Sequence, residues 1–541
     1  MRKLLIFVAA MMITVNLLAG GLVTNSNQSA MFTRLQNRNA STSIDAVYYN
    51  PAGLTKLGNG FFASINNQTV GQTKTVITDF PWISGVPKEY IGDVSAPVYP
   101  GVYLAYNTGK LSFSAGFNPI GGGGGAEYKT GLPSFETPIS SLPPSLRGQG
   151  IPTTAYAADI YFEGTSVYFG YQVNAAYKVS EQISVGLGLR YVSAKNTYNG
   201  YLRNIQINPT YPGFGPQYTG SMVSASGFFT DGSTVLNTLA TGSTTAATNL
   251  SALIAGGTPA ATPLTALPAV SQTQIAQLLG AAGISTTGMN IGTAAATLNA
   301  VAPNFAAKSA AMASYAAQTK DVEVDAEQTG SGVSPILSVN YSPSDKMNFS
   351  VRYEFRTNLE MTTSLIDNKG GGFFTEGEKT IADMPALLAL GAEVKPTDKL
   401  SLAATFNTYM DKKIDYDGSD KKNIAQIDKN FVEYGLGAEY SISDKLRASL
   451  GWVATSTGVL PAYQSDQRYS TNTDSWGAGF GYRVNSMIDV NIGGQYTFYD
   501  NDVQTYAYPS PASPLVKYNQ SYKKKTWIIG VGVDLYFGKT E

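Results

Sequence analysis

Large apolar residues occupy every second position in the last predicted strand of the chain. The positions between them are mostly small or polar, with Ile528 as the exception. A period of two places these sets on opposite faces of a β-strand, one suited to lipid and the other to a narrow or wet interior. The apolar row consists of Trp527, Ile529, Val531, Val533, Leu535 and Phe537.

The same alternation recurs in pairs of segments joined by turns of a few residues. Apolar residues alternate from Val167 to Val179 and from Ile183 to Tyr191, and Ser180 to Gln182 turn the chain. A connection this short requires an antiparallel pair. Further pairs of this form are 98–106 with 111–117, 337–341 with 347–355, 388–394 with 400–406, 434–442 with 446–454 and 476–484 with 488–498.

These six hairpins, with an opening strand near 61–70 and the closing strand, give about fourteen strands. Single-chain barrels of the outer membrane have an even number of strands, with short turns at one end and long loops at the other. The connections alternate in that way along the whole chain. The sequence therefore predicts an all-β fold: a transmembrane antiparallel barrel over residues 60–541.

Composition supports a membrane barrel and excludes several functions. Charged residues make up 14% of the chain, against roughly 25% in soluble domains. The absence of Cys and His removes thiolate chemistry and the commonest base and metal ligand. The net charge of −1 is unsuited to nucleic-acid binding. We therefore expect no cofactor, no metal and no catalytic residues.

The N-terminal segment has two predicted parts. Residues 1–20 combine a basic start, an apolar core and small residues near Ala19, which is the pattern of a cleaved signal peptide. Residues 21–59 are too short for a separate globular domain, but clustered Tyr48, Tyr49 and Leu54 distinguish them from a disordered leader. We expect this segment to fold into the barrel lumen as a plug.

A long external insertion is expected over residues 195–331. Its middle is rich in Ala, Thr and Leu and poor in charge, and 271–279 and 306–317 are expected to form short helices. Pro259, Pro263 and Pro268 are expected to break them. Composition leaves two interpretations open: a cap with an apolar collecting surface, or low-complexity filler.

These features together resemble the FadL-type outer-membrane transporters of long-chain fatty acids and hydrocarbons. The resemblance covers the mature chain and includes Asn50-Pro51-Ala52 just ahead of the first strand. It implies an N-terminal hatch, a location in the outer membrane and release of an apolar ligand into the lipid of that membrane. Gly532, Leu535 and Phe537 resemble the signal read by the barrel-assembly machinery, and the chain is expected to act as a monomer.

The resemblance also implies a side opening at a kink in the third strand. This strand is expected to end at Phe117-Asn118-Pro119-Ile120, with Gly121, Gly122 and Gly123 opening a run of glycines. Proline lacks a backbone donor, and glycine has no side chain to fill space. The alternative is the start of an ordinary flexible loop.

Ligand-binding candidates come from parity and from the resemblance. The family holds ligand carboxylates with basic residues, one just beyond the fifth strand, where Lys195 and Arg203 are the nearest counterparts here. Parity points Arg190 and Arg352 inward. Because unpaired buried charge is costly, most inward-facing charged residues are expected to pair with one another. They are Lys178, Arg190, Arg352, Glu354, Glu393, Glu439, Arg447, Arg483, Asp489 and Asp534.

Three functions are compatible with a membrane barrel. The pattern favours passive uptake of long hydrophobic molecules through a plugged channel with lateral release. A general diffusion porin is the alternative, and the plug-like segment disfavours it. An outer-membrane enzyme is less favoured, because the usual catalytic dyads and triads require His or Cys.

Overall fold

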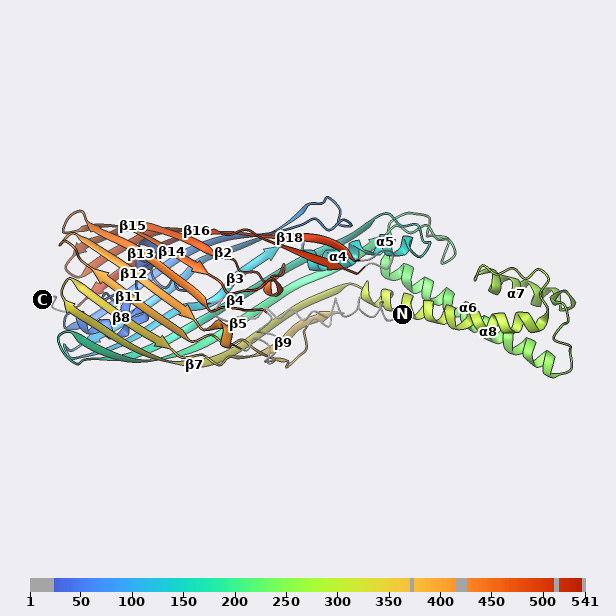
Figure 1. The fold of residues 1–541 in the computed structure, drawn as a ribbon, viewed down its shortest axis with the longest axis horizontal. Coiled ribbons are helices and arrows are strands. Elements are labelled where there is room, and N and C mark those ends of the chain that lie inside the picture. The colour runs from blue at the N-terminus through green and yellow to red at the C-terminus, as the bar shows by residue number, and fades with distance from the viewer. Residues whose placement is uncertain (1–23, 370–373, 415–425, 510–514, 538–541) are drawn as a thin grey trace.

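The computed structural model describes residues 24–369, 374–414, 426–509 and 515–537. They form a β-barrel with a helical arm that projects from one end (Figure 1). The tight turns between strands lie at the opposite end of the barrel. The expected signal peptide at 1–20 lies outside the described residues.

The barrel wall is one antiparallel sheet. It consists of β1 (Gly60–Thr78), β2 (Lys88–Asn107), β3 (Leu111–Tyr128), β4 (Tyr156–Lys178), β5 (Ile183–Ile207), β6 (Val223–Ser224), β7 (Val322–Ser344), β8 (Met347–Glu354), β9 (Glu360–Lys369), β10 (Lys379–Ile381), β11 (Leu387–Val394), β12 (Leu400–Tyr409), β13 (Phe431–Ser441), β14 (Leu446–Ser456), β15 (Thr473–Asn485), β16 (Ile488–Tyr499), β17 (Asp502–Tyr508) and β18 (Val516–Tyr536).

The sheet closes on itself because β1 pairs with both β2 and β18. β9 continues β8, β11 continues β10 and β17 continues β16, while β6 is a two-residue pairing at the edge of β5. The eighteen strands therefore correspond to fourteen strand positions around the barrel. This confirms the predicted antiparallel barrel of about fourteen strands.

An apolar band surrounds the barrel. The side chains of Trp527 on β18 and of Phe537, the residue after β18, are 46% and 59% exposed and mark the two edges of this band. Ten residues at roughly 3.3 Å each on a tilted strand give a height of about 25 Å, which matches the apolar band of a membrane barrel. No helix in the described part of the chain is long and apolar enough to cross a membrane.

Several strands are longer than a membrane crossing requires. β4 and β5 have 23 and 25 residues, against roughly 9–11 for one crossing. Their extra length raises the wall beyond the band at the helical end. There α4 (Pro133–Ser140) and α5 (Leu142–Arg147) connect β3 to β4.

The arm consists of α6 (Ala225–Ala255), α7 (Ala269–Gly280) and α8 (Ile291–Gln318). The helix expected at 271–279 corresponds to α7, and that at 306–317 is only the end of α8. α6 was missed because Thr, Ser and Gly, which are weak helix formers, hide its apolar row. The larger apolar side chains of α6 and α8 pack into a shared core, with the rings of Phe229 and Tyr315 centred 5.1 Å apart.

The N-terminal segment lies inside the barrel. It forms α2 (Ala30–Arg34), α3 (Ala46–Tyr49) and the 3-10 helix η2 (Pro51–Lys56), and nearly all of its side chains from 27 to 55 are buried. Its hydrogen bonds reach strands far apart around the wall, including Asn39 Nδ2 to Asn407 Oδ1 at 2.8 Å and Thr55 Oγ1 with Ser184 Oγ at 2.5 Å. The segment is therefore fastened to several sides of the lumen.

Glycines in the wall make room for this segment. A Cβ added at Gly493 would lie 2.6 Å from the Arg34 backbone nitrogen, and one at Gly477 would lie 2.5 Å from the Thr33 carbonyl oxygen. Added Cβ atoms essentially never fit so close to backbone. The small inward residues of the alternating strands are thus the positions where the chain in the lumen touches the wall.

The adjacent residues Gly493 and Gly494 of β16 provide a matched test of this packing. Gly493→Val should displace the segment in the lumen, because overpacking a tight contact costs about 1–3 kcal/mol. Gly494 faces outward, with no atom nearer than 4.0 Å to an added Cβ, so Gly494→Val should behave as wild type. We expect a higher ion conductance in planar bilayers for Gly493→Val alone. Equal conductance of both variants would contradict this packing.

Candidate functional site

The β2–β3 ladder is interrupted in the half of the barrel that is nearer the helical arm. The strands pair from Asn107↔Ser112 to Val102↔Phe117, and again only at Asp93↔Glu127 and Gly92↔Tyr128. The backbones of residues 94–101 and 118–126 are therefore not paired with each other across this boundary. The interruption begins about half-way up the apolar band, roughly 20 Å along the strand from Leu111.

The expected end of the third strand is wrong. β3 continues through Pro119 and the glycines to Tyr128 and stays paired with β4, with register shifts at Pro119/Gly121 and Gly121/Gly124. Gly122 and Gly124 have φ of 99° and 68°, which residues other than glycine rarely adopt. Gly123 has no atom within 4 Å of an added Cβ. The glycines thus bend β3 away from β2 instead of ending it.

The start of the described chain lies against this bend. Thr24 forms a β-bridge with Gly121, and the Asn25 backbone N–H donates to the Ile120 carbonyl at 2.9 Å. Gln28 Nε2 donates to the Pro119 carbonyl at 3.2 Å, and the Tyr99 hydroxyl donates to the same carbonyl. Carbonyl groups left without a backbone partner on β2 are therefore satisfied by the lumen segment and by the Tyr99 side chain, because backbone groups in lipid must be paired.

Two adjoining cavities lie inside the interruption. Their volumes are about 340 and 170 Å³, and both are lined by Lys74, Gly123, Gly124, Ser470 and Lys524. The first is within the usual range for ligand pockets. Apolar and aromatic side chains form much of the remaining lining, namely Val70, Val94, Tyr99, Tyr128, Phe162, Tyr198, Phe431, Val453, Tyr463, Tyr469, Tyr499 and Ile528.

The connection between β14 and β15 covers part of this space. Tyr463 and Tyr469 from this segment line the smaller cavity. Asp466 anchors it, because its carboxylate accepts a 2.6 Å hydrogen bond from the Ser134 backbone N–H in the first turn of α4. Burial raises the pKa of the Asp466 carboxyl, although that hydrogen bond opposes the change.

Lys74 and Lys524 place two amino groups at the junction of the cavities. They are directly opposite each other on β1 and β18. Lys524 Nζ donates to the Tyr469 carbonyl at 2.6 Å and lies 4.4 Å from the centre of that ring. No carboxylate in the described ranges forms a salt bridge with either lysine. An anion placed here would favour the charged form of both amino groups and offset the repulsion between them.

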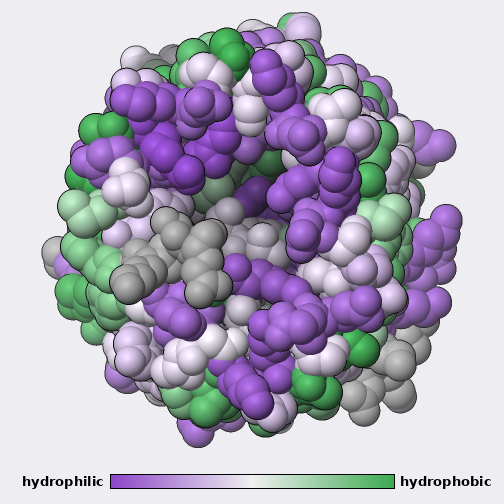
Figure 2. All heavy atoms as spheres, turned by 90° about the vertical axis from the view of Figure 1, so that its left-hand side faces the viewer, coloured by the Kyte–Doolittle hydropathy of each residue, from purple (hydrophilic) through white to green (hydrophobic). Residues whose placement is uncertain are grey.

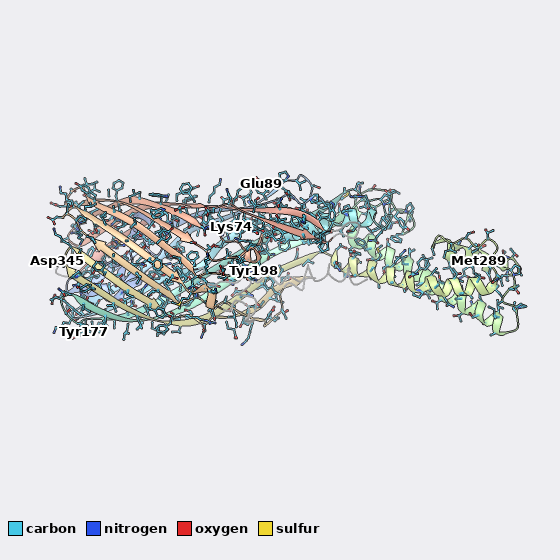
Figure 3. All side chains as sticks on the ribbon, viewed as in Figure 1. Lys74, Glu89, Tyr177, Tyr198, Met289 and Asp345 are labelled. Atoms are coloured by element: carbon cyan, nitrogen blue, oxygen red, sulfur yellow. The ribbon has the colours of Figure 1, made fainter. Side chains whose placement is uncertain are left out.

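The position of this site along the barrel is visible in Figure 3. Lys74 and Tyr198 lie toward the helical end, far from Asp345 at the turn end and from Met289 on the arm.

The lining of the larger cavity also includes the acidic residue Glu433, which accepts hydrogen bonds from Ser26 at 3.0 Å and Tyr409 at 3.0 Å. Basic and acidic groups thus lie at separate places on the lining.

The motif Asn50-Pro51-Ala52 contacts the barrel wall and is not part of the lining of either cavity. Asn50 Nδ2 donates to Asn340 Oδ1 at 2.7 Å and to the Ser41 carbonyl at 3.0 Å. The Ala52 backbone N–H donates to Ser338 Oγ at 3.0 Å, and Pro51 begins η2, where no donor is needed. The motif therefore joins the lumen segment to β7.

Arg190 and Arg352 hold the lumen segment and do not line the larger cavity. Each guanidinium lies 4.8 Å from the centre of the Tyr48 ring, and both pair with Glu354. Arg352 also donates to the Tyr48 carbonyl. Other inward charges pair as expected: Arg447 and Arg483 with Asp489, and Arg34 of the lumen segment with Glu439.

Lys195 and Arg203 lie on the outer face. Lys195 Nζ is 2.5 Å from Glu327, and Arg203 Nη1 is 3.6 Å from Glu323. Their inward neighbours are the buried Asn196 and Leu202. Neither residue reaches the cavities.

Sequence reasoning missed Lys74 and Lys524. A signal was present for Lys524, because Lys523-Lys524-Lys525 precedes the alternating strand in which odd positions point outward. The same parity turns Lys524 alone inward. Lys74 carried no comparable signal, since the expected first strand stopped near Val70.

Comparison with known proteins identifies the fold. No family model and no curated protein sequence matches the chain. The crystal structure of a FadL homologue from Pseudomonas aeruginosa matches with a TM-score of 0.56 and 11% identity, over 96% of this chain and all of that one. The toluene transporters TodX of P. putida and TbuX of Ralstonia pickettii match with TM-scores of 0.48 and 0.45 at 14% and 13% identity.

The match with TodX covers 92% of this chain and 95% of TodX. The match with TbuX covers 91% of this chain and 94% of TbuX. At such low identity the likeness of the FadL homologue concerns the fold. The resemblance noted from the sequence is confirmed at that level: the chain has the FadL-type barrel fold.

Proposed function

We propose that this chain is an outer-membrane channel for the passive uptake of long hydrophobic molecules. The observation that carries the proposal is the position of the cavities directly inside the β2–β3 interruption, with Gly123 and Gly124 in both linings. A ligand in this space is next to the lipid without crossing the lower lumen. The chain is then a transporter and not an enzyme.

Lateral release follows from the energetics of an apolar ligand. An acyl chain gains about 0.8 kcal/mol per methylene removed from water. Exit through the turn end would forfeit that gain, because hydrophilic side chains surround the hollow there (Figure 2). A 210 Å³ cavity at this end is lined by Lys56, Asp345, Lys346, Glu393 and Lys395. Exit between β2 and β3 keeps the ligand in an apolar environment.

In this proposal the lumen segment 21–59 acts as the plug. Its hydrogen bonds to Pro119, Ile120 and Gly121 would have to rearrange for a ligand to leave sideways. The chain would work as a monomer, inserted by the barrel-assembly machinery. The ligand's own gradient would supply the driving force.

The lysine pair favours ligands that carry an acidic head. A carboxylate near Lys74 and Lys524 would relieve their repulsion, while its acyl chain would lie along the aromatic lining. A long-chain fatty acid satisfies both requirements. An unsubstituted hydrocarbon satisfies only the second.

Narrowing the interruption should block uptake. Gly123→Leu introduces a side chain where φ is not positive and no atom lies near the added Cβ. The barrel should therefore fold, while fatty-acid uptake by cells falls to a small fraction of the wild-type rate. Gly280→Leu at the end of α7 has an equally open Cβ position and is the control. Wild-type uptake by Gly123→Leu would place the exit elsewhere.

Replacing the two lysines should weaken the binding of fatty acids but not that of hydrocarbons. Hydrogen bonds to charged groups contribute about 1.5–3 kcal/mol, so Lys74→Gln/Lys524→Gln should weaken fatty-acid binding at least about tenfold. Binding of an alkane of equal length should not change. Isothermal titration calorimetry of the purified protein measures both. An equal loss for both ligands would show that the lysines act through structure alone.

Single cysteines test the orientation, because the chain has no native Cys. Val270 on α7 is 80% exposed, and Val270→Cys should react with an impermeant maleimide on intact cells. Asp444→Cys in an exposed tight turn should react only after the outer membrane is permeabilised. The opposite pattern would invert the proposed topology.

A further inference from the structure

Two prolines lie where the β2–β3 ladder stops. The last pair nearer the turn end is Val102↔Phe117, and the same register two residues further on would bring Pro100 opposite Pro119. Neither proline has a backbone N–H, so this pair could exchange no N–H···O=C hydrogen bond. Both strands therefore contribute to the interruption, and the glycines of β3 are only part of its cause.

A bulge holds β2 beside the interruption. Here the single residue Thr69 of β1 is opposite both Pro97 and Val98 of β2. The Pro97 carbonyl accepts hydrogen bonds from Thr69 Oγ1 at 3.0 Å and from Asn67 Nδ2 at 3.2 Å. The backbone N–H of Tyr99 donates to Asn67 Oδ1 at 3.0 Å. Because the main chain of β2 is fastened to β1 at this point, side chains are the parts that can move.

The Tyr99 side chain spans the gap on its lumen side. Tyr99 is opposite Gln68, a buried inward residue of β1, and it lines the larger cavity. Its hydroxyl donates to the Pro119 carbonyl of β3 and accepts a hydrogen bond from Asn25 Nδ2 of the lumen segment. One side chain therefore joins β2, β3 and the lumen segment at the end of the interruption that is deeper in the apolar band.

Moving this side chain would leave the neighbouring backbone paired. The Pro119 carbonyl has a second donor, Gln28 Nε2 of the lumen segment, at 3.2 Å. The backbone N–H of Tyr99 stays bonded to Asn67 within the bulge. Turning the side chain away therefore costs the two hydrogen bonds of its hydroxyl and not the larger penalty of an unpaired backbone group in lipid.

We propose that Tyr99 is the gate of the lateral exit. With its hydroxyl on Pro119 it closes the deeper end of the interruption, and a ligand leaves when the side chain turns away. Asn25 holds the same hydroxyl, so a movement of the lumen segment frees the gate and links the plug to the exit. This inference deepens the proposed function and rests on it, because such a gate requires a ligand that leaves sideways.

The test measures how fast a bound long-chain fatty acid with a fluorescent label leaves the full mature protein for the surrounding bilayer of a lipid nanodisc. Tyr99→Phe keeps the ring and removes both hydrogen bonds, so release should be at least about fivefold faster. The Kd should not change, because a gate affects entry and exit alike. Tyr106→Phe removes a 52% exposed hydroxyl-bearing side chain's polar group from the outer face of the same strand and should behave as wild type. Release from Tyr99→Phe at the wild-type rate would overturn the inference.

Further measurements separate the gate from a binding residue and from the proposed function. Asn25→Ala removes one of the two hydrogen bonds and should speed release by a smaller factor, about twofold or more. A changed Kd with an unchanged release rate in Tyr99→Phe would identify a lining residue and overturn the inference. If wild type shows no saturable fatty-acid binding, the proposed function fails and the gate with it. Heat-modifiable migration on gels confirms that each variant remains a folded barrel.

Discussion

Hydrogen bonding of the backbone is the constraint on which this structure depends. In lipid an unpaired N–H or carbonyl costs several kcal/mol, so a membrane barrel must pair each strand on both edges. β1 closes the sheet by pairing with β18 as well as β2. Where β2 and β3 separate, the chain supplies other donors to the carbonyls of Pro119 and Ile120 from Gln28, Tyr99 and Asn25. The opening in the wall and the segment in the lumen are therefore one structural unit.

The lumen segment fits inside the barrel because several inward-facing wall positions are glycines without a side chain. A barrel of fourteen strands with large side chains on both faces would leave no room for a chain inside. Glycines at 451, 477, 493 and 530 let the backbone near Thr33 to Gln36 approach the wall. Asn, Gln and Ser at other inward positions provide hydrogen-bond partners. The resulting contacts hold the segment at defined positions around the lumen.

Charge in this barrel is distributed by strand parity. Most inward charges are neutralised by another charge, as in the Arg190–Glu354–Arg352 cluster around Tyr48. Lys74 and Lys524 differ, and they lie where the lining becomes aromatic. The run Lys523-Lys524-Lys525 shows how parity separates neighbours: its middle residue faces the cavity and its outer two face the outside of the barrel. A single basic run thus contributes to two surfaces.

The sequence by itself determined the barrel, its strand number and most inward-facing charges, because a period of two is a local property of each strand. It also located the glycine run of the third strand. The tertiary structure decided that β3 continues past Pro119, since pairing with β4 is a long-range contact. It likewise decided that Lys195 and Arg203 point outward and that Lys74 and Lys524 meet. β1 and β18 are the first and last strands, and only barrel closure brings their lysines together.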